Sequence, residues 1–220
     1  MAQIAEILGY SNDVASFQKR FGERKKFLNE TYVDKKTMQT VHSGVAVASF
    51  GPPSTPPEKG KPMDTQASYA IPLGFDLIEP QHKEAFMENF VGTITRENTD
   101  DQGAVHPPNS LMTGFIGTAS ISRALSENGR DDLAYQMLQQ ETYPSWLYPV
   151  VNGATTIWER LNSYTNEAGF GGNNSMNSLI IMLLVPLRHG CMNISGIQRD
   201  PAHPGFKHFV LRPTPDPTGK

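Results

Sequence analysis

Apolar residues recur every three or four positions along much of this chain, the spacing typical of amphipathic helices. The first such segment predicts a helical hairpin that turns at Gly9, and its second helix carries the apolar stripe Val14, Phe17, Phe21 and Leu28. The spacing fails from Asp34 to Pro62, where prolines and glycines cluster. Because these residues interrupt both helices and strands, this segment is predicted to be a long surface loop.

Later helices are predicted from their start and stop signals. Asp64 is a candidate cap for a short helix that Pro72 ends, and Pro80 suits the first position of a helix reaching Glu97. The core residues expected in that second helix are Phe86, Phe90, Val91 and Ile94. Further predicted helices run from Leu111 to Leu125, from Asp131 or Asp132 through Leu138, and from Thr155 to Leu161. One strand is predicted from Phe206 to Arg212.

Composition places the chain among globular proteins and narrows its partners. With 220 residues, 38% of them hydrophobic, and a net charge of −3, it has enough apolar residues for a core and is neither collagen-like nor disordered. The absence of a basic stripe predicts no nucleic-acid partner. The most apolar run, Leu179 to Leu187, is far shorter than the roughly 20 residues of a membrane span, so no membrane partner is predicted.

Cysteine and histidine usage predicts neither a disulfide nor a metal site. Cys191 is the single cysteine, so an internal disulfide is excluded. No two histidines have the i, i+4 spacing of a helical metal site, and none has a neighbouring carboxylate pattern that suggests zinc; they are His42, His82, His106, His189, His203 and His208. We therefore expect no metal and no cofactor. The amino terminus lacks the pattern of a signal peptide, which favours a cytoplasmic location.

The two tryptophans suggest a candidate site. Trp146 and the run Trp158-Glu159-Arg160 bring aromatic rings and a carboxylate into one part of the sequence. Proteins bind sugars by stacking C–H groups on aromatic rings, and they cleave them with carboxylates. The alternative reading is structural, with both tryptophans packed in the core and Glu159 and Arg160 exposed.

Several motifs occur in an order that resembles a known family. They are Thr113 to Thr118 (TGFIGT), Asp132 to Tyr135 (DLAY), Gln140 to Tyr148 (QETYPSWLY), Gly153 to Arg160 (GATTIWER) and Asp200 to Pro213 (DPAHPGFKHFVLRP). Together they resemble the bacterial α-L-rhamnosidases of glycoside hydrolase family seventy-eight. The resemblance is strongest from Leu111 to Pro213 and weak before Asp64.

The resemblance implies a mostly α fold built as a six-hairpin α/α toroid, in which twelve helices form two concentric rings. This chain would supply only part of that toroid, followed by a short β segment. The implied division is residues 1–197 for the second half of the toroid and residues 198–220 for the start of a C-terminal β-domain or tail.

The resemblance also implies an inverting hydrolase of terminal α-L-rhamnosides. Glu159 would be the general base, Trp146 and Trp158 would form the sugar platform, and Arg160 would orient the carboxylate. Glu141 would accept a hydrogen bond near the substrate, with a structural role as its alternative. The family's general acid lies in an upstream acidic segment, and no matching segment precedes Asp64.

Two departures from the family leave a second hypothesis open. Leu161 stands where another tryptophan is common, and Leu179, Ile180 and Ile181 replace a Phe-Asn-His run. The resemblance lapses from Leu179 to Cys191, which suggests a local shift of reading frame. The alternative function is therefore an inactive toroid fragment that binds sugar or acts as a scaffold, and that associates with itself or with a missing toroid half. A third reading keeps the architecture and changes the glycoside that is hydrolysed.

Overall fold

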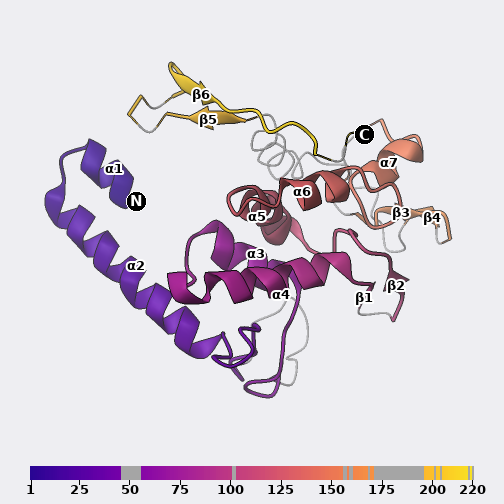
Figure 1. The fold of residues 1–220 in the computed structure, drawn as a ribbon, viewed down its shortest axis with the longest axis horizontal. Helices are drawn as coiled ribbons and strands as arrows, with labels where there is room; N and C mark the ends of the chain where they lie inside the picture. The colour runs from indigo at the N-terminus through magenta and orange to yellow at the C-terminus, as the bar shows by residue number, and fades with distance from the viewer. Residues whose placement is uncertain are drawn as a thin grey trace. The chain divides into compact units, whose positions relative to one another are not determined.

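The computed structural model consists mainly of α-helices with a few short strands (Figure 1), and the chain divides into two units. It describes residues 1–45, 56–100, 103–155, 158, 161–167, 169–170, 196–200, 202–203, 205–217 and 219. Unit 1 comprises Met1–Asp64 and Asp76–Phe86, and unit 2 comprises Thr65–Phe75 and Met87–Lys220. The mostly α fold class is confirmed, because α-helices form the longest elements in the described part of both units.

Unit 1 begins with the predicted helical hairpin. Helix α1 (Ala2–Ile7) and helix α2 (Ser11–Thr31) contact each other and are joined at Gly9, whose φ of +77° suits glycine (Figure 1). The apolar stripe of α2 is only partly covered within unit 1, because Phe21 remains exposed. In the region of the predicted loop after α2, Val33 pairs with Thr40 and Val41 pairs with Pro62 in isolated antiparallel β-bridges.

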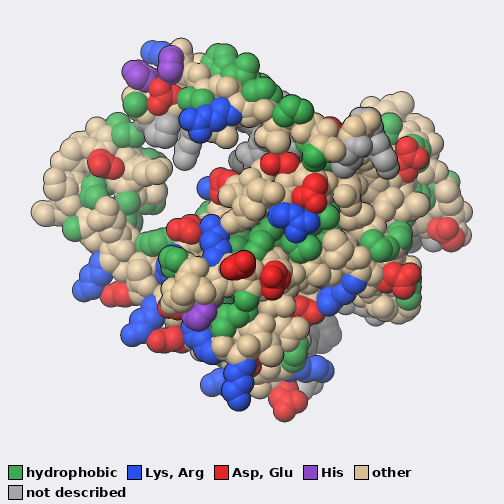
Figure 2. All heavy atoms as spheres, in the orientation of Figure 1, with side chains coloured by type: hydrophobic (Ala, Val, Ile, Leu, Met, Phe, Trp, Pro, Cys, Tyr) green, Lys and Arg blue, Asp and Glu red, His purple; other side chains and the backbone are tan. Residues whose placement is uncertain are grey.

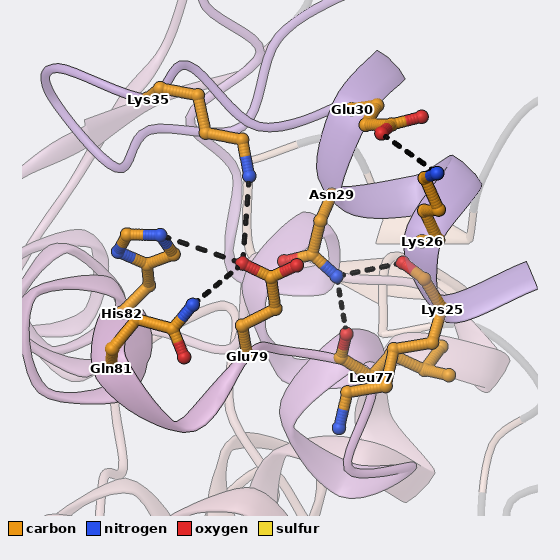
Figure 3. Close-up of polar contacts among 9 residues, drawn as sticks. All are labelled: Lys25, Lys26, Asn29, Glu30, Lys35, Leu77, Glu79, Gln81 and His82. Atoms are coloured by element: carbon orange, nitrogen blue, oxygen red, sulfur yellow. Dashed lines mark hydrogen bonds and ion pairs between the residues drawn. The ribbon is translucent and has the colours of Figure 1, made fainter. Parts of the chain in front are cut away.

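A buried asparagine fastens α2 to the segment that follows residue 75. Asn29 is 1% exposed, and its Nδ2 donates to the carbonyl oxygens of Lys25 at 2.8 Å and Leu77 at 2.7 Å (Figure 3). Nearby, the Oε2 atom of Glu79 is approached by the side-chain nitrogens of Lys35, Gln81 and His82 (Figure 3). These polar contacts stabilise unit 1 where its two chain segments meet.

Two of the predicted helix starts can be compared directly with the structure. Pro80 opens a short 3-10 helix, η1 (Pro80–His82), which leads into helix α4 (Lys83–Thr95), so that prediction is confirmed. The cap assigned to Asp64 is wrong, because helix α3 (Gln66–Gly74) is capped by Thr65, whose hydroxyl accepts from the Ser68 N–H in a capping box. Pro72 lies inside α3 instead of ending it.

The core of unit 2 forms where α3, the later part of α4, α5 (Phe115–Ser126) and α6 (Asp131–Leu138) bury their apolar faces. Helices α3 and α5 approach closely at Gly117, where an added Cβ would overlap the Thr113 side chain and lie 2.8 Å from the Cβ of Ala67. Phe90 and Ile94 are fully buried as predicted, and Val91 is half-buried. Phe86, also fully buried, lies at the end of unit 1.

Helix α6 starts at the predicted position and has an ion pair in its first turn. Both Nε and Nη2 of Arg130 donate to the Asp132 carboxylate at 3.0 Å, and these hydrogen bonds hold the pKa of Asp132 below its ordinary value. A negative charge in the first turn also complements the helix dipole.

Asp132→Asn is expected to lower the free energy of unfolding by about 0.5–1 kcal/mol at pH 7, a small effect because the pair is partly exposed. Since the folded-state pKa is lowered, this contribution is present above the ordinary carboxyl pKa of about 3.9 and is lost as the pH falls through the folded-state value. Urea unfolding across this range measures it, and a difference from the parent chain that does not change with pH would contradict the assignment.

Short strands are the part of the fold that the helical pattern did not indicate. The described part contains three two-stranded antiparallel sheets: β1 (Asn98–Thr99) with β2 (Val105–His106), β3 (Tyr164–Thr165) with β4 (Gly169–Phe170), and β5 (Ile197–Arg199) with β6 (Phe209–Leu211). Only β6 falls within the predicted strand. Helix α7 (Leu147–Val151) was also not predicted.

The helix predicted from Thr155 to Leu161 does not form at its described positions. Thr155 lies in a bend, Trp158 has no regular secondary structure and Leu161 lies in a turn. Among the residues that the structure describes, no helix is both long and apolar enough to cross a membrane.

The end of the chain is fastened to α6. The hydroxyl of Tyr135 donates to the carbonyl oxygen of Thr214 at 2.7 Å, and Nε2 of Gln139 donates to the Asp216 carboxylate at 2.8 Å. One face of α6 therefore holds the segment that follows β6.

Candidate functional site

The predicted site residues differ in their burial and contacts, and two of them are not described by the structure. Trp158 is 8% exposed, and its ring packs edge-on against Tyr164 with the ring centroids 6.1 Å apart. Trp146 directly precedes α7 and is half-buried. Glu141 is exposed, and its backbone N–H donates to Oε1 of Gln140. Glu159 and Arg160 lie outside the described residues, so the roles assigned to them stay predictions.

Tyr148 joins the segments on either side of Trp158 in the sequence. The Tyr148 N–H donates to the buried Ser145 hydroxyl at 3.1 Å, which positions the first turn of α7. The Tyr148 hydroxyl accepts from the Asn166 N–H at 3.0 Å in the turn between β3 and β4. Helix α7 and the β3–β4 hairpin are thus fixed to each other by a buried side chain.

A row of rings extends from Tyr148 to the β1–β2 hairpin. The Tyr143 ring lies edge-on to Tyr148 at 5.5 Å and to His106 at 5.4 Å, measured between centroids. Burial raises the pKa of Tyr143, so its hydroxyl stays protonated at neutral pH. Tyr148 and His106 are buried and Tyr143 is half-buried, so the row mainly packs α7 against the β1–β2 hairpin.

An aspartate orients the histidine at the end of this row. The Oδ2 atom of Asp100 lies 3.0 Å from Nε2 of His106, while Oδ1 accepts from the Ala104 N–H at 2.9 Å. The hydrogen bond from the Ala104 N–H fixes the Asp100 carboxylate, and the carboxylate in turn fixes the His106 ring. The His106 side chain is only 8% exposed. The Asp100–His106 pair therefore stabilises the β1–β2 hairpin, whose strands contain only two residues each.

Sequence reasoning missed Asp100, His106, Tyr143 and Tyr148 as neighbours. The hairpin that positions Asp100 and His106 has strands of two residues, which is too short for an alternating pattern to indicate them. The turn residue Gly103 was the available signal for a hairpin. The structural reading of Trp158 as a packed ring fits its burial, whereas half-buried Trp146 keeps part of its surface accessible.

Comparison with known sequence families gives a match over most of the chain. Residues 1–182 match the family described as the bacterial alpha-L-rhamnosidase 6 hairpin glycosidase domain. The match ends inside the segment from Leu179 to Cys191 where the motif resemblance lapses, and the proposed change of reading frame there lies outside the described residues.

Curated relatives are named as alpha-L-rhamnosidases, in agreement with the family match. The chain is 38% identical over 157 residues to an alpha-L-rhamnosidase of an Alteromonas species and 37% identical over 153 residues to one of Formosa agariphila. These alignments cover 70% and 69% of this chain but only 15% of each relative. The matched part is therefore a small portion of those proteins.

Solved structures share the fold. The native alpha-L-rhamnosidase of Aspergillus terreus superposes with a TM-score of 0.71 at 24% identity, covering 97% of this chain and 21% of that protein. The Streptomyces avermitilis alpha-L-rhamnosidase complexed with L-rhamnose superposes with a TM-score of 0.68 at 29% identity, covering 97% of this chain and 17% of that protein. With the family match, these likenesses confirm the predicted partial six-hairpin toroid.

Proposed function

Because this chain belongs to the bacterial α-L-rhamnosidase six-hairpin glycosidase family, we propose that it acts in the hydrolysis of terminal α-L-rhamnosides. The observation that carries the proposal is the family match itself, which spans Trp146, Trp158, Glu159 and Arg160. We assign residues 1–197 to the second half of the toroid and residues 198–220 to the start of a C-terminal β-domain or tail.

The proposed mechanism inverts the sugar's anomeric configuration. Glu159 removes a proton from a water molecule as the water oxygen attacks the anomeric carbon from the face opposite the aglycone. The bond between the anomeric carbon and the glycosidic oxygen breaks, and a carboxylic acid donates a proton to the departing oxygen. The two carboxyl groups must stand about 6.5–9.5 Å apart to admit the water. We assign the acid to no residue of this chain.

The described contacts favour a sugar-binding role for half-buried Trp146 more than for Trp158, which is 8% exposed. Trp158, the residue before Glu159, is held by its ring contact with Tyr164. Trp146 is half-buried next to the fixed first turn of α7, so part of its ring is available to stack on a sugar face. Arg160 would orient the base, and Glu141 would accept a hydrogen bond from the substrate or its surroundings.

A second candidate function is an inactive fragment that binds sugar or acts as a scaffold. The exposed apolar residues of the first hairpin favour it: Ile4, Ile7, Leu8, Phe21 and Phe27. Exposed apolar side chains promote association, so this hypothesis predicts self-association or binding to another toroid segment. Sedimentation as a monomer at all concentrations, without added partner, would count against self-association.

The proposal predicts that the purified chain releases p-nitrophenol from p-nitrophenyl α-L-rhamnopyranoside. The first-formed sugar, followed by proton NMR, should be β-L-rhamnose, because inversion places the new hydroxyl on the opposite face. The corresponding aryl α-D-mannoside serves as a control and should not be cleaved. No release from the rhamnoside would favour the inactive-fragment alternative, and α-L-rhamnose as the first product would contradict inversion.

A further inference from the structure

A carboxylate and two imidazoles meet at one end of the β5–β6 hairpin. Arg199 pairs with Phe209 in the last register position of this sheet, so Asp200 and His208 follow side by side where the strands separate. His203 lies in the connecting turn, and its N–H donates to the Asp200 carbonyl oxygen at 3.1 Å. Figure 2 shows histidine and acidic side chains together on the surface at this end of the hairpin.

Both imidazole rings face the same carboxylate oxygen. The Oδ2 atom of Asp200 lies 2.8 Å from Nδ1 of His203 and 2.7 Å from Nδ1 of His208, and the two rings are 5.2 Å apart between centroids. The other oxygen, Oδ1, accepts from the Ala202 N–H at 2.9 Å. The backbone therefore fixes the carboxylate with Oδ2 directed at both imidazoles.

This donor set suits a transition-metal ion. One carboxylate oxygen and two imidazole nitrogens, with water at a remaining position, match the ligands and coordination number of Zn²⁺. The potential ligand atoms all lie within 4.8 Å of one another.

The site can accept an ion with little rearrangement. Zinc bonds of about 2.0–2.1 Å place tetrahedral ligand atoms about 3.3 Å apart, slightly farther than the hydrogen-bonded atoms here. Both histidine side chains are 64% exposed, while the Asp200 side chain is only 18% exposed. The rings can therefore move outward while the aspartate stays in place, and an ion can enter without opening the core.

We propose that Asp200, His203 and His208 bind one divalent transition-metal ion of the Zn²⁺ class. The ion replaces the protons shared between the imidazoles and the carboxylate. It then joins the connecting turn to the ends of both strands and stabilises the hairpin. This site is independent of Glu159 and of the proposed hydrolysis.

The experiment is a titration of the untagged, chelator-treated chain with ZnCl₂ by isothermal calorimetry. We expect one ion per chain. Asp200→Asn, His203→Gln and His208→Gln should each weaken binding by more than the roughly 10–100-fold that loss of an outer-shell partner costs. His82→Gln is the matched control, because His82 lies 3.5 Å from the Glu79 carboxylate and belongs to no such three-residue group among the described residues. Cys191→Ser should leave binding unchanged.

Cobalt(II) provides a second measurement. Its visible absorption should appear in the parent chain without a thiolate charge-transfer band and should be lost in the Asp200→Asn and His208→Gln double variant. Circular dichroism of each variant establishes that the helices remain folded. Absence of zinc binding to the parent chain, retention in the double variant, or loss in Cys191→Ser would overturn the proposal.

Discussion

Glu159→Gln is expected to lower kcat for rhamnoside hydrolysis by about 10²–10⁴-fold. Glutamine keeps the size and the hydrogen-bonding reach of the side chain but cannot remove a proton from water. The attacking water then stays neutral, while leaving-group protonation by the acid is unaffected. Because binding contacts are mostly preserved, KM should change much less than kcat. Initial rates with the aryl rhamnoside measure both quantities.

Azide distinguishes a lost base from a damaged site. An azide ion needs no deprotonation, so it should attack from the same face and restore turnover in Glu159→Gln with formation of the β-rhamnosyl azide. Glu167→Gln is the control, since Glu167 is an exposed residue in the turn between β3 and β4. Equal rates for Glu159→Gln and the parent chain would remove Glu159 from the mechanism. Loss of turnover without azide rescue would indicate a structural defect.

The helices were predictable where apolar spacing and a clear terminator occur together. Helix α5 ends just before the turn at Gly129, whose φ is +71°, and α6 begins at Asp131 as expected. Both signals are local, because a periodic apolar face and a glycine turn act within a few residues of each other. The helical hairpin at Gly9 was predictable for the same reason.

The parts that escaped prediction depend on contacts between distant residues or on very short elements. The choice of Thr65 over Asp64 as the cap of α3 depends on a reciprocal bond with Ser68, and both residues are acceptable caps by type. His203 and His208 were judged by helical spacing, but a hairpin brings them to Asp200, so i, i+4 was the wrong template. Asp100 and His106 likewise meet across a two-residue ribbon.

Gln66→Ala is expected to lower the free energy of unfolding of unit 2 by about 2–4 kcal/mol. Gln66 is 1% exposed at the start of α3. Its Nε2 donates to the carbonyl oxygens of Ser110 at 2.8 Å and Thr93 at 3.3 Å, and its Oε1 accepts from the Met112 N–H at 2.9 Å. One side chain thus links α3 to the end of α4 and to the segment before α5.

The size of the effect follows from the groups left behind. The Thr93 carbonyl keeps a bond from Nδ2 of Asn98, whereas the Ser110 carbonyl and the Met112 N–H lose their bonds to Gln66. Each buried polar group without a partner costs about 1–3 kcal/mol, and truncation also leaves a cavity. Urea unfolding followed by circular dichroism gives the difference, provided that the m-value is unchanged.

Gln66→Glu removes the hydrogen-bond donor Nε2 of the side-chain amide and keeps the acceptor Oε1. The carboxylate can still accept from the Met112 N–H, but it replaces a donor with an oxygen facing two carbonyl oxygens, so the loss should be at least as large as for alanine. Exposed Gln81, which donates only to Glu79 among the described residues, provides the control, and Gln81→Ala should change stability by less than about 0.5 kcal/mol. A Gln66→Glu chain as stable as the parent would contradict this account. The hydrogen bonds donated by Nε2 would then not be what joins the three segments, and the packing of the side chain would have to explain its burial.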